Sequence, residues 1–395
     1  MLTLGLSAAE RADFEYALRH SHTRRIDVEV LTLNGDVLSQ LTPVLVDGQV
    51  NCDMDAEVTR SATLTFLDPR HALNFDTDSP DEGALYADRM IRIRYGVYVE
   101  KLSRYVFVPV FTGPVTGLSR EGVTVTVEAQ GKESLLRGTL WEPLTLRKGL
   151  EVTAALRALI RDRGGERSLS IPGIFNRYGN PPTLPKTRSL DRFTEIWPVA
   201  MSLARGLDRQ LFYTGDGVAT LRPWPETVAY TFTTGDGGDL LSELSVNYQL
   251  DEMKNVVIVR GQPPTGKKEI IFGRAQAPKQ HPLSPERLGR TGAPRYLVEQ
   301  VEDPSIRTDA AAKEQAARLL EKHLREVVEV EFDAMPIPHL DVGDVVRVQT
   351  PSFTTKFRVR KFAIPLAPTG APPMTVGYLR RLTPVKRSDR RSAKR

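Results

Sequence analysis

The sequence contains a single cysteine, Cys52, among its 395 residues. One thiol can form neither an internal disulfide nor a thiolate zinc site, which indicates a chain made in a reducing compartment and stabilised without crosslinks. No apolar run approaches the ~18 residues that a membrane-spanning helix needs. The N-terminal residues lack the basic and apolar regions of a signal peptide, so we expect none. Cys52 is expected to pack beside a strand rather than to act as a nucleophile.

The recognisable motifs of catalysis are also missing. Six histidines occur without H-E-x-x-H spacing, and there is no G-x-S-x-G elbow. Residues 261–268 approach a phosphate-binding loop, but Lys268 stands where that loop needs a hydroxyl for Mg²⁺, and Pro263 and Pro264 lack backbone N–H groups. The acidic loop 76–83 lacks the glycine and late glutamate of an EF-hand, so it is expected to be solvated. We therefore predict no catalytic residue, no cofactor and no metal, although carboxylates that pair only in space stay an open alternative.

Positive charge is concentrated at the C-terminal end. The net charge is +5, and the last ten residues hold six basic side chains and one acid, so the rest of the chain is balanced. Such a tail favours contact with nucleic acid or an acidic partner surface, and the alternative is a disordered, solubilising end. The candidate contact residues are Lys386, Arg387, Arg390, Arg391, Lys394 and Arg395.

Residues 24–144 have a β pattern. Residues 26–30, 58–66, 90–95 and 123–129 alternate between apolar and polar side chains, which is the period of a half-buried strand. Asn34 and Gly35 form a strong hairpin-turn signal. Short strands separated by such turns predict a closed or nearly closed antiparallel barrel. Alternate arginines on predicted strands, such as Arg92 and Arg94 or Arg358 and Arg360, are expected on a solvent face, and no known nucleic-acid-binding module is visible.

The period changes to that of helices in residues 145–229. Apolar side chains at 152, 155, 156, 159 and 160 lie on one helix face, which Gly164 and Gly165 end. A second helix is predicted over about 190–207, where Pro198 either kinks it or marks its start. A hairpin follows at 210–222. This segment is therefore predicted to be a small two-helix α+β module.

A second β segment is predicted over 230–383. It includes an inserted loop at 261–305, a helix at 308–326, and turns at 335–338 and 343–344 that lead into a strand. Residues 1–23 are predicted to be a helical arm, with Ser7 and Glu10 as a capping box, and 384–395 to be the basic tail.

The two β segments share a layout. Residues 88–93 are similar to 343–348, and each stretch is followed by an aromatic-bearing strand and then by a Thr-Val strand. The predicted fold class is mainly β with α+β character: two related antiparallel β-barrel domains flank the small two-helix module.

This order of segments resembles a known family. The residues that carry the resemblance include 25–30, 58–69, 127–133, 143–149, 255–257, 281–285 and 294–297. As an ordered set within about 24–383, they resemble the baseplate-hub or tail-tip hub proteins of tailed bacteriophages, and most closely the minor tail proteins of siphophages that infect actinobacteria.

The resemblance implies a structural protein of the virion, made in the host cytoplasm and placed at the distal end of the tail. It implies a homotrimer whose paired barrels form a pseudo-sixfold ring. Its implied partners are a distal tail protein, the tape measure protein, and other minor tail or receptor-binding proteins, with no specific nucleic acid and no membrane insertion. Any enzyme would lie in another chain. The alternatives are a tail-associated cell-wall hydrolase and a nucleic-acid-binding protein.

Overall fold

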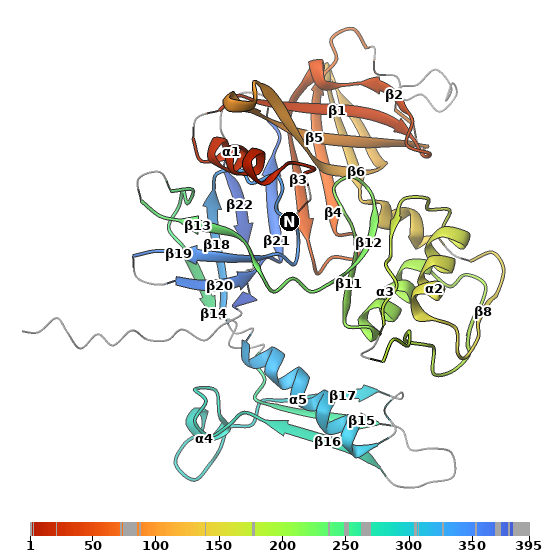
Figure 1. Cartoon of the computed structure of the whole chain (residues 1–395), viewed down its shortest axis with the longest axis vertical. Helices are drawn as coiled ribbons and strands as arrows, with labels where there is room; N and C mark the ends of the chain where they lie inside the picture. The colour runs from red at the N-terminus through yellow and green to blue at the C-terminus, as the bar shows by residue number, and fades with distance from the viewer. Residues whose placement is uncertain are drawn as a thin grey trace, which may run out of the picture. The chain divides into compact units, whose positions relative to one another are not determined.

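The computed structural model is shown in Figure 1. It describes residues 2, 4–20, 22–71, 73, 85–86, 88–138, 140–175, 178–235, 238–248, 253–261, 270–303, 306, 308–325, 328–351, 354–367, 373–377 and 380–381. The chain divides into two compact units. The first unit comprises Met1–Glu243, Phe332–Val346 and Val359–Val376, and the second comprises Leu244–Glu331, Arg347–Arg358 and Gly377–Arg395. No helix within the described ranges is long and apolar enough to cross a membrane.

The N-terminal arm forms one helix, α1 (Ala8–Leu18). The Ser7 hydroxyl accepts a hydrogen bond from the Glu10 backbone N–H, and the Glu10 carboxylate accepts one from the Ser7 N–H, so the predicted capping box is present. Phe14, Ala17 and Leu18 are the buried face of this helix, as their spacing predicts.

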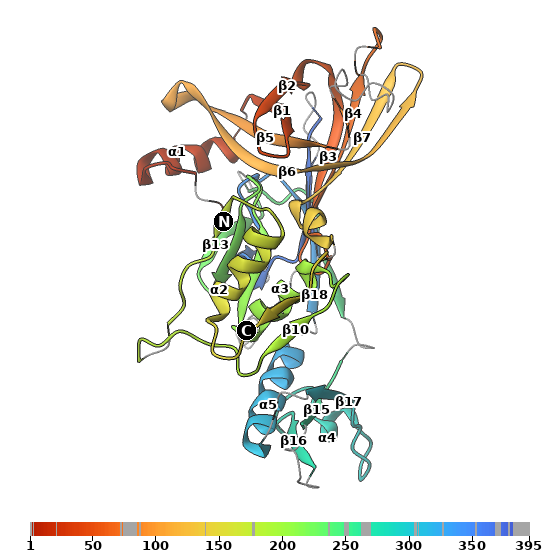
Figure 2. The same cartoon turned by 90° about the vertical axis from the view of Figure 1, so that its right-hand side faces the viewer.

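The first β segment forms seven antiparallel strands. They are β1 (Arg24–Thr32), β2 (Val37–Gln40), β3 (Leu45–Asp53), β4 (Arg60–Leu67), β5 (Arg89–Val99), β6 (Arg104–Glu121) and β7 (Thr124–Gln130). Figure 2 shows the long strand β6, which pairs with β5 in its first part and with β7 in its second. Gly113 lies where the pairing of β6 changes from β5 to β7, which is called the β6 crossing below. A side chain here would place its Cβ 1.9 Å from the carbonyl oxygen of Gln130, so the β6 crossing requires glycine.

The predicted closed barrels are not found among the described strands. The edge of β3 pairs in antiparallel register with β21 (Lys361–Pro365), a strand of the second β segment, with Phe362 opposite Cys52. Because β21 occupies this edge, the first seven strands do not close on themselves. They instead belong to one open eleven-stranded sheet, with the order β14-β18-β22-β21-β3-β4-β7-β6-β5-β1-β2. Its other strands are β14 (Ser245–Tyr248), β18 (Val328–Ala334) and β22 (Met374–Gly377).

The predicted α+β module has a hydrophobic core of its own, which includes Leu156, Ile160, Trp197, Leu203 and Tyr213. Its strands are β8 (Leu144–Leu146), β9 (Leu169–Ser170), β10 (Arg188–Leu190), β11 (Arg209–Tyr213) and β12 (Ala219–Pro223). Its helical elements are η3 (Lys132–Arg137), α2 (Val152–Arg157), the π-helical continuation η4 (Ala158–Arg163), and α3 (Ile196–Gly206). Pro198 is the third residue of α3, a position whose N–H has no intrahelical partner, so the helix begins near this proline instead of at 190.

The stretch predicted to be an inserted loop, 261–305, instead carries regular structure. It contains β16 (Ile271–Gln276), α4 (Pro285–Leu288) and β17 (Val298–Asp303), while residues 262–269, which hold most of the phosphate-loop-like stretch, lie outside the described ranges. β15 (Val256–Gly261) pairs antiparallel with β16 and parallel with β17. Helix α5 (Asp309–Arg325), within one residue of its predicted bounds, packs on this sheet through Ala312, Ala316 and Leu320.

The remaining strands are β13 (Val228–Thr233), β19 (Val345–Gln349), β20 (Thr354–Arg358) and β23 (Arg380–Arg381). The predicted turn before β19 is present: Gly343 has a φ of +81°, and the backbone N–H of Asp344 donates to the carbonyl of Asp341. The mainly β fold with a helical module is thus confirmed and the closed barrels are not found among the described strands, whereas the domain bounds stay a prediction.

Candidate functional site

The six basic residues predicted as partner contacts, Lys386, Arg387, Arg390, Arg391, Lys394 and Arg395, lie outside the described residues. So does most of the acidic loop 76–83. Three of the arginines predicted on strands are engaged with acids. Arg92 and Arg94 both donate to the carboxylate of Glu29, and Arg360, which lies between β20 (Thr354–Arg358) and β21, donates to Asp55 at 2.6 Å. Their charges are therefore satisfied within the protein instead of being offered to an anionic ligand.

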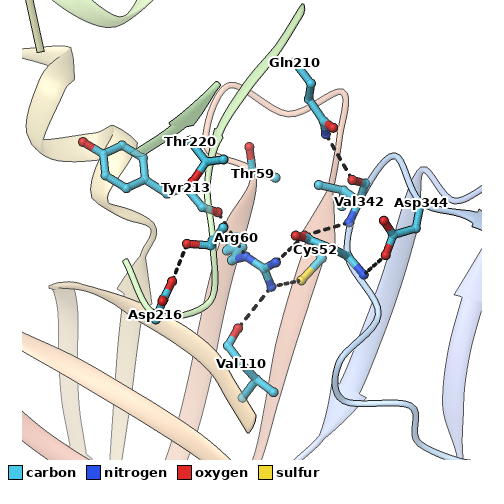
Figure 3. A network of polar contacts seen from close by, with 12 residues as sticks. Cys52, Thr59, Arg60, Val110, Gln210, Tyr213, Asp216, Thr220, Val342 and Asp344 are labelled. Carbon is cyan, nitrogen blue, oxygen red and sulfur yellow. Dashed lines mark hydrogen bonds and ion pairs between the residues drawn. The ribbon is translucent and has the colours of Figure 1, made fainter. Parts of the chain in front are cut away.

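The most unusual group of the first unit is the guanidinium of Arg60, whose side chain is only 2% exposed. Figure 3 shows it between the strands that carry Cys52 and Val110 and the segments that carry Tyr213 and Val342. Arg60 begins β4, in phase with the buried side chains at 62, 64 and 66, so the strand period itself directs this charge into the core.

Every nitrogen of this guanidinium has a partner. Its Nη2 lies 2.6 Å from Oδ1 of Asp341, a carboxylate that is 1% exposed. Its Nη1 donates to the Val110 carbonyl oxygen at 3.1 Å and contacts Sγ of Cys52 at 3.0 Å, while Nε donates to the Tyr213 carbonyl at 3.3 Å. A buried charge is tolerated only with such pairing, because burial removes its hydration.

The turn that carries Asp341 is also held from the α+β module. The carbonyl oxygen of Val342 accepts hydrogen bonds from Gln210 at 3.1 Å and from Arg222 at 2.7 Å. A Cβ on Gly343 would lie 2.9 Å from the Gln210 amide, so glycine is needed for this approach as well as for the positive φ. The Arg60 network, defined here as Arg60 with its direct partners, therefore joins the first β segment, the module and the second β segment within one unit.

Two acids lie beside the network. Glu133 is fully buried, and its Oε1 accepts weak hydrogen bonds from the backbone N–H groups of Thr59 and Tyr213 at 3.4 Å. Burial raises the pKa of Glu133. Glu166 lies 2.7 Å from Nζ of Lys132 and accepts a hydrogen bond from the Tyr213 hydroxyl at 3.2 Å.

The groups of the Arg60 network are suited to holding chain segments together, a role called a clamp below, and not to catalysis. Burial raises the pKa of the Cys52 thiol to about 12, so the thiol stays protonated at neutral pH and is a poor nucleophile. Arginine does not give up its proton, and the pKa of Tyr213 is also raised by burial. The sequence alone does not predict the network, because its partners are up to 281 positions apart, although a charged residue in phase with a buried strand face is a usable signal.

A second buried polar residue anchors the N-terminal arm. His339 is 0% exposed and meets the ring of Phe14 edge-on, with ring centroids 5.2 Å apart. Neither ring nitrogen has a hydrogen-bond partner among the described residues. Burial lowers the pKa of His339 to about 3, so the ring is neutral at physiological pH.

Comparison with known proteins gives a fold but no close relative. No protein-family model matches the sequence, and no curated protein is detectably similar to it. The structure is similar to a tail protein from Neisseria meningitidis, with a TM-score of 0.61 and 12% identity over 90% of this chain and 96% of that one. It is also similar to a 43 kDa tail protein of prophage MuSo2 from Shewanella oneidensis, with a TM-score of 0.59 and 11% identity over 90% and 98% of the two chains.

A third similar structure is a prophage tail protein from Listeria monocytogenes, with a TM-score of 0.55 and 10% identity over 89% of this chain and 94% of that one. At such low identity the likeness concerns the fold. The resemblance to phage tail proteins that the sequence indicated is confirmed at this level.

Proposed function

We propose that this chain is a structural hub protein of a phage tail tip and has no catalytic activity. The observation that carries the proposal is the extent of the shared fold, which takes in about nine-tenths of this chain and 94–98% of three tail proteins. A fold shared over one β segment alone would be compatible with many functions. The shared fold here extends through both β segments and the module, which supports a common role as a structural component.

The chemistry of the interior supports the same role. The charged groups of the Arg60 network are paired with each other and with backbone carbonyls, and Asp341 is only 1% exposed. This arrangement fixes three chain segments together, which suits a component that must keep its shape within an assembly. A hydrolase would instead need a base or nucleophile that a substrate can reach.

The finer proposal is a homotrimer that forms a pseudo-sixfold ring. Its support is the similar layout of the two β segments, in which residues 88–93 are similar to 343–348 and lead into β5 and β19. Two related segments in each of three copies supply six similar positions around an axis, which matches a threefold component to a sixfold tube. We further propose that the ring joins the tail tube or distal tail protein to the tape measure protein and to receptor-binding proteins, with residues 386–395 contacting an acidic surface.

Native mass spectrometry of the purified full-length chain, over a range of protein concentrations, tests the oligomeric state. The expected result is a trimer at high concentration, and a monomer throughout contradicts the ring. A peptidoglycan zymogram run on the same preparation tests the absence of catalysis, since a zone of clearing would establish a hydrolase.

A further inference from the structure

The α+β module displays two large aromatic side chains at neighbouring positions. Trp141 is 85% exposed and Phe193 is 71% exposed. The backbone N–H of Phe193 donates to the carbonyl of Leu140, and the N–H of Leu140 donates to the carbonyl of Thr194, so residues 140–141 and 193–194 run side by side. Trp141 and Phe193 are called the aromatic patch below. Exposed apolar side chains on adjacent backbone segments mark interaction surfaces more often than single ones do.

The backbone of Phe193 is strained. Its φ is +67°, in the left-handed region that bulky side chains seldom adopt. Glycine or asparagine would occupy this position at lower cost, and the exposed ring gains little from burial within its own chain. The strain is therefore explained best if the ring contributes to a contact outside the chain.

Charge indicates what the aromatic patch contacts. Residues 137–225, which carry the elements of the module that follow η3, hold fourteen Lys and Arg against eight Asp and Glu, a net charge of +6. Residues 24–136, which carry β1 to β7, hold eleven basic against seventeen acidic residues, a net charge of −6. Within that segment, residues 26–59 contain seven acids and no lysine or arginine. The module of one copy is therefore electrostatically complementary to the first β segment of another.

The acidic segment also offers an apolar surface of its own. Strand β2 is the last strand of the large sheet, and no further strand pairs with it among the described residues. Leu33, Val37 and Leu38 are each 48–50% exposed, and together with the exposed Asp36 they are called the β2 edge below. An unprotected edge of this kind is a site for association with another chain.

Matching single charges lie beside the two surfaces. Arg192 precedes Phe193 and is exposed, and no ion pair to it is found in the described part of the chain. Asp36 precedes Val37, and its carboxylate accepts only a hydrogen bond at 3.4 Å from the Thr32 hydroxyl in the described structure. The aromatic patch thus lies beside a positive charge, Arg192, and the apolar side chains of the β2 edge lie beside a negative charge, Asp36.

We propose that the aromatic patch and Arg192 of one copy dock on the β2 edge of the next copy. The two surfaces differ, so the contact is head-to-tail, and such contacts close into a ring when the rotation between copies allows it. This inference rests on the proposed function, for which it supplies the contact between copies.

A charge swap tests the contact in the full-length chain. Arg192→Glu and Asp36→Arg should each weaken self-association about fivefold or more, measured as the dissociation constant by analytical ultracentrifugation in low salt. The double variant should recover most of this loss, because the pair is restored with its signs exchanged. Single variants that associate as the unmodified chain does, or a double variant no better than either single, would overturn the proposal.

Phe193→Gly gives a second test that does not depend on charge. It relieves the backbone strain, so the thermal midpoint should stay equal or rise while self-association weakens. Loss of both stability and association would assign the ring a role inside its own chain and refute the docking role. Photo-crosslinking from position 141 should label residues 24–59 of another copy, and a crosslink to any other segment or protein contradicts the contact.

The two proposals fail in different ways. An unmodified trimer that Arg192→Glu and Phe193→Gly leave intact refutes this contact and leaves the hub in place. An unmodified chain that stays monomeric at every concentration contradicts the ring and this contact together.

Discussion

Replacing Arg60 by leucine removes the centre of the clamp and leaves the carboxylate of Asp341 buried without its main partner. Arg222 also pairs with Asp341, but more distantly, with 3.8 Å between its Nη1 and Asp341 Oδ2, so it offsets only part of the loss. Loss of one partner from a buried ion pair costs about 3–5 kcal/mol. The carbonyl oxygens of Val110 and Tyr213 also lose hydrogen-bond donors, at a cost of about 1–3 kcal/mol each. These costs are not additive with that of the lost ion pair. We expect Arg60→Leu to lower the free energy of unfolding of the first unit by about 5 kcal/mol, a large part of the ~5–15 kcal/mol typical of a domain.

Urea denaturation followed by tryptophan fluorescence is the assay. All three tryptophans, Trp141, Trp197 and Trp224, lie in the first unit, so the signal reports that unit alone. The matched control is Arg137→Leu, which breaks an exposed pair with Glu57 and should cost at most about 1 kcal/mol.

A double-variant cycle isolates the ion pair from simple loss of packing. Asp341→Asn should destabilise the unmodified protein, because a buried guanidinium then loses its counter-charge. The same substitution should stabilise the Arg60→Leu variant, because it neutralises a buried carboxylate that has lost its main partner. Arg60→Leu that costs no more than Arg137→Leu, or an Asp341→Asn effect of one sign in both backgrounds, would refute the assignment of Arg60 as a clamp.

Two further features of the same unit, His339 and Gly113, are tested by substitution. The pKa of His339 is lowered from 6.5 to about 3 on folding, so its protonation favours the unfolded state, and stability should fall by up to about 1.4 kcal/mol for each pH unit below 6.5. His339→Phe should flatten this decline between pH 6.5 and 4.5 in thermal unfolding, and an unchanged pH profile would rule out the buried neutral ring as its cause. Gly113→Ala should cost about 3 kcal/mol or more, because its Cβ would clash with the carbonyl of Gln130. Gly206→Ala, in open space at the end of α3, should instead leave urea stability equal or raise it by up to about 1 kcal/mol, and equal effects of the two glycine substitutions would contradict the crossing described for β6.

Features set by local sequence were predicted well. The capping box at Ser7 and Glu10 involves residues three positions apart, and α5 is defined by a stripe of apolar side chains at helical spacing. The positive φ at Gly343 is likewise a property of a single turn.

Features set by distant pairing were not predicted. The edge of β3 is filled by β21, some 300 positions away in the sequence, and this pairing replaces barrel closure with a continuous sheet. β15 and β17 pair in parallel, although many proline and glycine residues lie between them. Because this stretch has little periodicity, neither β16 nor β17 was predicted. The same limit applies to the site. The strand period indicates that Arg60 is buried, but only the three-dimensional structure identifies Asp341 as its partner.

The proposed ring consists of three copies of this chain at the tip of a phage tail. A cryo-EM reconstruction of the tail tip of the virion is the most direct test. We expect three copies around the tail axis, with the aromatic patch of each on the β2 edge of the next. A tail tip whose density is fully explained by other chains, or a copy number other than three, would contradict it.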